Sequence, residues 1–198
     1  MSGHGHGAHG HHEDHGNGNK GVALLIAILA LLLAFSEMGG KYAEKETVAQ
    51  NLESSNFWAF FQAKTIRRTS VQVASEDMQV RLATATDDAA KVVMEKRIAD
   101  WKKTADRYET EPETGEGRRE LMARAKKAEE IRDIQKARNE LFEGSSALLQ
   151  IAIVLASAMI ITGIGALIWL AIGLGGLSLV IMGVAVLRPE WLMHFLHH

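Results

Sequence analysis

Cysteine is absent from this chain of 198 residues, and only 6% of its residues are aromatic. The absence of cysteine excludes disulfides, thiol catalysis and thiolate metal sites. Net charge is small as well, because 22 Lys and Arg face 24 Asp and Glu, for a formal charge of -2. A chain without a basic excess lacks the bulk charge of a nucleic-acid binder, so we expect no nucleic-acid partner.

Charge is missing altogether from two long stretches, although 23% of the residues are charged. The first stretch, residues 22–36, reaches the length of one short membrane span when it is extended to residues 21–40, which adds one acid, Glu37. The second, residues 147–187, would be about 60 Å long as a single helix, twice the thickness of the hydrocarbon core. The chain is therefore expected to interact with a lipid bilayer through three spans.

The second uncharged stretch is expected to form two spans joined by a tight turn within residues 165–169. These spans are placed at residues 147–165 and 169–188. Trp169 and Trp191 are separated by about 33 Å in a helix, so we assign them to the two membrane interfaces of the third span. A cleaved signal peptide is an alternative for the first span, but a leader whose only base is Lys20 favours a retained span.

Small residues recur in each expected span at alternating steps of four and three. Such stripes let helix backbones approach closely, and the spacing suits left-handed crossings. We therefore expect the stripes to be packing faces, with the lining of a pore as the alternative. The stripes are Ala23, Ala27, Ala30 and Ala34; Ala152, Ala156, Met159, Gly163 and Ala166; and Ala171, Gly175, Ser178, Met182 and Ala185.

Between the first and second spans, residues 41–146 form a charged insert whose composition predicts helix almost throughout. Its clear breaker is a turn at residues 111–117, which contains proline and two glycines. Before this turn, an apolar seam at heptad spacing crosses Asp87 and Asp88 without losing register, so we expect one unbroken helix there. The seam includes Val71, Met78, Leu82, Ala85 and Val92.

The helical arm before the turn is longer than the arm after it. From Phe57 to Tyr108 the first arm would measure about 80 Å, whereas the return arm from Arg118 to Glu143 would measure about 40 Å. Either the longer arm bends back or another subunit covers the remainder of its seam. We predict a homo-oligomer that forms through the seam.

Four aromatic residues and three cations stand close together in NFWAFFQAKTIRR. Clustered aromatic side chains beside cations suit a helix that lies at the headgroup level of a bilayer. An aromatic packing cluster inside the protein is the alternative, because helical spacing gives both faces some aromatic area. The residues assigned to the membrane interface are Phe57, Trp58, Phe60 and Phe61.

The same region carries a family resemblance. The segment VALLIAILALLLAFSEMGGKYAEKE, followed by SNFWAFFQAKTIRR, resembles the bacterial membrane proteins grouped as domain of unknown function 4337 (DUF4337). The resemblance covers nearly everything after Lys20. It implies a shared architecture in which the first span is retained, and it brings no activity, cofactor or catalytic residue.

Histidine is concentrated in the N-terminal tail, residues 1–20. Neutral imidazoles bind Zn, Ni and Cu well. However, the alternation of His and Gly defines no closed site, and such tails are normally disordered. We expect weak, adventitious binding of Zn or Ni, with a physiological metal role as the alternative. The ligands would be His4, His6, His9, His11, His12 and His15.

Sequence motifs of enzymes are missing: there is no nucleophile elbow, P-loop, dinucleotide fingerprint or zincin motif. Glu37, the acid at the end of the first span, is a functional hypothesis by its position. We expect it to be shallow enough to reach water, so a hydrated acid without a functional role is the favoured interpretation. We therefore expect neither enzymatic activity nor a catalytic residue nor a bound cofactor.

Basic residues flank the insert where it meets the spans, as at Lys41, Lys45 and Arg138. The positive-inside rule then places the insert in the cytoplasm, and the family resemblance favours the bacterial inner membrane. The sequence thus predicts an all-α, multi-pass membrane protein with three transmembrane helices, a long coiled-coil-like insert and a C-terminal tail at residues 189–198. Its function is either that of a self-associating structural or interaction protein with an unidentified partner, or that of an oligomeric ion channel or metal-handling transporter.

Overall fold

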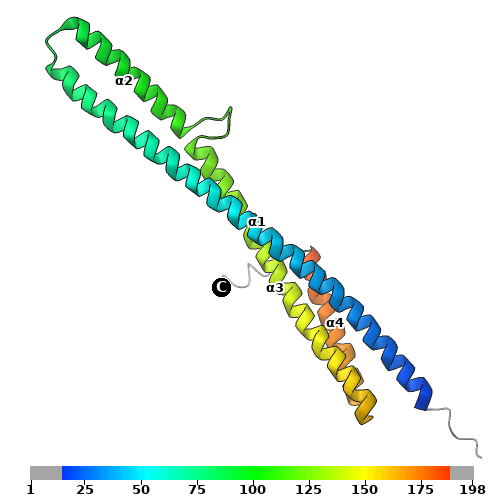
Figure 1. Ribbon diagram of the computed structural model, residues 1–198. Helices are drawn as coiled ribbons and strands as arrows, with labels where there is room; N and C mark the ends of the chain where they lie inside the picture. The colour runs from blue at the N-terminus through cyan, green and yellow to red at the C-terminus, as the bar shows by residue number, and fades with distance from the viewer. Residues whose placement is uncertain (1–14, 188–198) are drawn as a thin grey trace, which may run out of the picture. The chain divides into compact units, whose positions relative to one another are not determined.

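The computed structural model describes residues 15–187, with side chains from Lys20 onward. This part of the chain contains four helices and no strand (Figure 1). This confirms the all-helical class, and three of the helices are long and apolar enough to cross a membrane. The helices are α1 (His15–Thr84), α2 (Asp88–Glu109), α3 (Arg118–Thr162) and α4 (Ala166–Leu187).

The helices are divided between two compact units. The span unit contains the described residues up to Glu44 and from Ile134 onward, so it holds the first part of α1, the second part of α3 and all of α4. The insert unit is Lys45–Asp133, which holds the rest of α1, all of α2 and the beginning of α3.

The core of the span unit joins large side chains of α1 to small residues of α3 and α4. Leu29 is buried against this core, and a Cβ on Gly175 would stand only 2.7 Å from its Cδ2 atom. A side chain on Gly175 would therefore displace the Leu29 side chain where α4 packs against α1. The buried members of the core are Val22, Leu29, Leu149, Ala152, Ala156 and Ala171.

The alanine stripe expected to pack in the first span faces away from the other helices. Its members are exposed, whereas Val22, Leu29 and Ser36 on α1 are buried. Within the described chain the expectation is wrong for this span, because large side chains of α1 pack against the small residues of α3 and α4 instead. The exposed members are Ala23, Ala27, Ala30 and Ala34. The stripe of α4 does pack, with Ala171, Gly175, Ser178 and Ala185 buried.

Serine hydroxyls connect the helices of the span unit. Ser36 Oγ donates to the carbonyl oxygen of Phe142 at 2.9 Å, and the hydroxyls of Ser145 and Ser178 lie 2.6 Å apart. Arg138 Nε donates to the carbonyl oxygen of Ala185 at 3.1 Å and thereby satisfies one of the free carbonyls near the end of α4. These three hydroxyls and the Ala185 carbonyl therefore have partners on a neighbouring helix.

The turn between α3 and α4 lies at residues 163–165, earlier than the expected 165–169. Gly163 adopts φ 72°, and its N–H donates to the carbonyl oxygen of Met159 at 2.9 Å. This left-handed residue ends the helix in the way that glycine does most easily. Trp169 consequently belongs to the first turn of α4, where its side chain is exposed.

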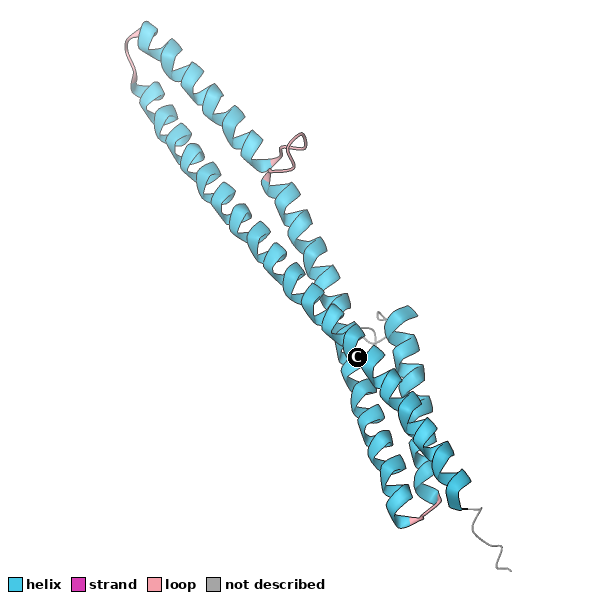
Figure 2. Cartoon of the chain, turned by 45° about the vertical axis from the view of Figure 1, so that its right-hand side comes forward, coloured by secondary structure: helices cyan, strands magenta, loops and turns pink. Residues whose placement is uncertain are grey.

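Helix α1 ends at Thr84, so the unbroken helix expected across Asp87 and Asp88 is wrong. Figure 2 shows the loop that separates α1 from α2, and the two helices run side by side in opposite directions in both views. Asp87 is the N-cap of α2, and its side chain accepts a hydrogen bond of 3.1 Å from Ala89 N. A capping aspartate and an acid in the first turn favour a helix start at this point.

Candidate interaction sites

Trp58 of the aromatic and basic stretch contacts the beginning of α3 within the insert unit. Its Nε1 donates a hydrogen bond of 2.8 Å to Glu129 Oε1, which also accepts from Ser54 Oγ at 3.3 Å. The Trp58 ring meets Phe61 edge-on, with 5.4 Å between the ring centroids. This geometry combines an aromatic pair with a satisfied indole N–H.

Two arginines of α3 cover the other aromatic rings. Arg124 Cζ lies 4.2 Å from the centroid of Phe57, and Arg118 Cζ lies 4.9 Å from that of Phe61. Phe57 and Phe61 are half-buried by these contacts, whereas Phe60 is exposed. The contacts are those of the packing alternative, and the position of this stretch at a headgroup layer stays a prediction.

Glu109, the last residue of α2, gathers three arginines. Its carboxylate lies 2.6 Å from Arg118 Nη1, 3.3 Å from Arg119 Nε and 3.2 Å from Arg68 Nε. The contact to Arg68 is an ion pair without the alignment of a hydrogen bond. Burial alone would raise the pKa of Glu109, but hydrogen bonds from Arg118 and Arg119 and the nearby positive charges lower it overall. The carboxylate therefore stays ionised and joins all three helices of the insert unit.

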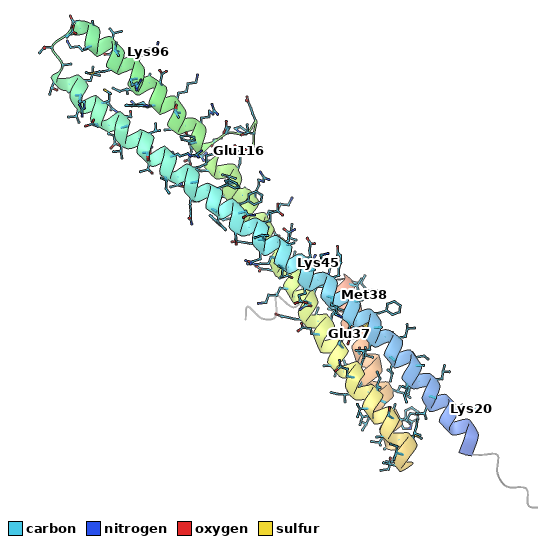
Figure 3. The ribbon with its side chains drawn as sticks, in the orientation of Figure 1. Lys20, Glu37, Met38, Lys45, Lys96 and Glu116 are labelled. Carbon is cyan, nitrogen blue, oxygen red and sulfur yellow. The ribbon has the colours of Figure 1, made fainter. Side chains whose placement is uncertain are left out.

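Lys64 is held next to this cluster by the loop between α2 and α3. Its Nζ lies 3.5 Å from Glu111 Oε2, 3.9 Å from Glu116 Oε2 and 5.5 Å from the ring centroid of Tyr108. Burial would raise the pKa of Glu111, but the charges of Arg107 and Lys64 outweigh this effect and lower it. Figure 3 labels Glu116 in the loop.

The seam assigned to an oligomer is divided between two helices. Val71, Met78 and Leu82 lie on α1, Ala85 lies in the loop, and Val92 lies on α2 with its side chain exposed. Residues on the same face of α1, at a step of seven, are buried or half-buried within the chain: Ser54, Phe61, Arg68, Ser75 and Leu82. The arm before the turn at residues 111–117 bends back at residues 85–87, which is one of the two alternatives considered. Val71, Met78 and Leu82 are half-buried within the insert unit.

The opposite side of α1 carries a second apolar row that sequence reasoning missed. Residues separated by two positions lie about 200° apart on a helix, so this row is diametrically opposed to the buried one. Its four large members are between 58% and 68% exposed, and its one alanine is also exposed. We call the outer row the residues Leu52, Ala59, Ile66, Val73 and Val80. Their step of seven in the sequence is the signal by which this row could have been identified.

A polar cleft of about 480 Å³ lies in the span unit between α1 and α3. Glu37 and Lys41 line it from α1, and Asn139 and Glu143 line it from α3. Figure 3 labels Glu37 on α1. Glu37 therefore borders other polar groups, and its depth in a bilayer stays a prediction.

The candidate metal ligands His4, His6, His9, His11, His12 and His15 lie outside the residues whose side chains are described. Trp191 lies outside them as well. Among residues 20–187, no three His, Cys, Asp or Glu side chains are close enough together to hold a metal ion.

Comparison with known protein families gives a match over most of the chain. The family model described as "Domain of unknown function (DUF4337)" matches residues 18–188. No curated protein and no solved structure matches the chain.

Proposed function

This chain belongs to the DUF4337 family, and we propose that it is a membrane-anchored structural or interaction protein that associates with a second copy of itself through the outer row. In this proposal the role is non-catalytic, the membrane is the bacterial inner membrane, and the insert lies in the cytoplasm. The observation that carries the proposal is the outer row itself, which the other helices of the insert unit leave uncovered.

The spacing of the outer row favours another helix as its partner. A strict step of seven keeps an apolar row facing the partner helix of a left-handed supercoil. A helix surface that faces only solvent is not constrained to this spacing. The residues four positions further along, which complete the heptad seam, are Asn56, Ala63, Ser70 and Asp77, and all are exposed. The seam is thus apolar in one of its two layers and small or polar in the other.

The membrane favours a parallel pair of identical chains. Copies that insert with the same topology have parallel α1 helices, and in register each row residue then meets its own counterpart. Asn56 occupies a seam position where a single buried asparagine specifies register in parallel pairs. In the same register Glu76 flanks Arg81 of the second copy, which gives opposite charges at the edge.

Asp77 opposes this association, because two copies would bring like charges together in the seam. Arg81 Nε lies 2.9 Å from Asp77 Oδ2 within each chain, and this ion pair offsets part of the repulsion. The expected contact is therefore tightest between Leu52 and Val73 and weaker toward Val80.

Disulfide crosslinking of the Cys-free chain in native membranes tests the proposal. Single substitutions Ile66→Cys and Val73→Cys are expected to crosslink each chain to its own copy, because a parallel, in-register pair brings identical positions together. Ser75→Cys, on the buried side of α1, is the control that should give no crosslink.

A second measurement uses light scattering corrected for bound detergent. Ile66→Asp is expected to convert the associated protein into a monomer, whereas Val93→Asp on α2 should leave it associated. The two side chains are equally exposed, 67% each, so the comparison isolates the row from general surface polarity. A monodisperse monomer for the unchanged protein would contradict the proposal.

A further inference from the structure

A groove of about 390 Å³ lies in the insert unit between α1 and the beginning of α3. Phe57, Phe60 and Leu121 provide its apolar surface, and Phe60 is exposed there. Lys64, Arg67 and Arg124 contribute cationic groups. The groove therefore combines exposed ring surface with an excess of positive charge inside a single chain.

The arginines of this groove differ from most others in the insert unit. Among the described residues, Arg68, Arg81, Arg107, Arg118, Arg119 and Arg132 each pair with a carboxylate. Arg67 and Arg124 have no such ion pair. The one carboxylate at the groove is that of Glu116, which lies 3.9 Å from Lys64 and is mostly exposed. Two guanidinium groups thus remain available for an anion.

The surroundings of Arg124 favour an anion that also carries an apolar part. The Cζ atom of its guanidinium lies 4.2 Å from the centroid of the Phe57 ring, a cation–π contact that restrains the group without neutralising its charge. Guanidinium groups bind carboxylates and phosphates through two parallel hydrogen bonds, and ring surfaces such as that of Phe60 cover apolar chains.

We infer that this groove binds an amphiphilic anion, meaning a phosphate or carboxylate attached to a short apolar chain. The anion contacts Arg67 and Arg124, and the apolar chain lies on Phe60 and Leu121. A lipid headgroup region and a free metabolite both offer this chemistry.

Hexyl phosphate is a suitable soluble probe, titrated by calorimetry into the full-length protein in nanodiscs of zwitterionic lipid. Saturable binding is expected, and Arg124→Gln should weaken it at least tenfold because a charge-assisted contact is lost. Arg97→Gln is the matched control: Arg97 has no carboxylate partner among residues 20–187 and lies over Trp101 at 5.3 Å, but it is not part of the groove. This control should bind like the unchanged protein.

Two further titrations examine each half of the ligand. Inorganic phosphate and hexyltrimethylammonium are both expected to bind at least tenfold more weakly than hexyl phosphate. Equal binding by Arg124→Gln, or by either of these probes, would overturn the inference. Arg124 is on α3 and outside the outer row, so the two proposals can fail separately. If the cysteine variants do not crosslink but hexyl phosphate still binds, only the proposal of self-association is rejected.

Nanodiscs that contain phosphatidylglycerol distinguish the two sources of the anion. If the natural ligand is a lipid of the same bilayer, hexyl phosphate binding should weaken in these discs relative to zwitterionic discs. Unchanged binding assigns the groove to a soluble amphiphile. Arg124→Gln should remove the difference between the two kinds of disc.

Discussion

The two units of this protein are built from the same secondary structure but are held together by different forces. Every ion pair among the described residues lies in the insert unit, where the helices also share cation–π contacts. The span unit uses small residues, close backbone approach and paired serines instead. This is the difference expected if lipid surrounds the span unit and water the insert unit, because apolar side chains gain free energy by leaving water but not by leaving lipid.

One substitution made in both units tests this comparison most strongly. Leu121→Ala in the insert unit removes a buried side chain that water would otherwise surround, so we expect a loss of about 3 kcal/mol. Leu149→Ala in the span unit loses packing but almost no transfer free energy, so we expect about 1–2 kcal/mol.

Each loss can be measured where it occurs. Hydrogen exchange of residues 118–133 reports the insert unit. For the span unit, a fluorophore pair attached through two introduced cysteines on α3 and α4 reports unfolding in an SDS titration. Equal losses in the two units would break the comparison.

Removing the charge at the centre of the arginine cluster is expected to have a smaller effect. Glu109→Gln leaves Arg118, Arg119 and Arg68 without their shared carboxylate, and partial exposure limits the cost to about 1–2 kcal/mol. Hydrogen exchange should show faster opening of α2 near its end, with no change in α4. Lys91→Gln, which breaks the exposed pair with Asp88 within α2, is the control and should cost less.

The pH dependence of the same cluster has a defined direction. Because folding lowers the pKa of Glu109 below its ordinary value of 4.5, its contribution is complete above that pH and is lost as pH falls through the lowered value. Glu109→Gln should therefore narrow the difference in stability between pH 7 and acid. If the variant and the unchanged protein lose stability in parallel, the cluster does not contribute in this way.

The smallest effect is expected for the serine pair of the span unit. Ser145→Ala removes the hydroxyl contact to Ser178, and interhelical hydrogen bonds in membranes contribute on average about 0.6 kcal/mol. Ser157→Ala is the control, because Ser157 Oγ donates only to the carbonyl oxygen of Ile153 within its own helix. An SDS titration that follows the separation of α3 from α4 compares the two variants.

The sequence predicted the features that depend on composition and length. The three span-forming helices follow from uncharged stretches, and the loop before Arg118 follows from Pro112 and its glycines. It did not predict the end of α1 at Thr84, because the apolar seam kept its register while the capping role of Asp87 was overlooked. The sequence pattern also assigned four alanines to a packing face, although alanine can equally face lipid. These residues are Ala23, Ala27, Ala30 and Ala34.

The candidate interaction sites were harder to predict for a physical reason. Two opposite faces of α1 have the same seven-residue period. The buried face is easier to identify from the sequence because its apolar seam is more continuous. Polar residues such as Asn56 and Ser70 interrupt the outer row in the sequence. Likewise, the sequence shows the cations near Phe57. It does not show that most other arginines of the insert unit pair with carboxylates, which is what distinguishes Arg124 from them.

The short turn at residues 163–165 has a consequence for biosynthesis. It contains no ionisable group, so α3 and α4 can leave the translocon together as a helical hairpin without carrying a charge across the bilayer. In such a hairpin the hydroxyls of Ser145 and Ser178 already face each other, so neither helix has to expose its hydroxyl to lipid on its own. The second and third spans are thereby suited to enter the membrane as one insertion unit.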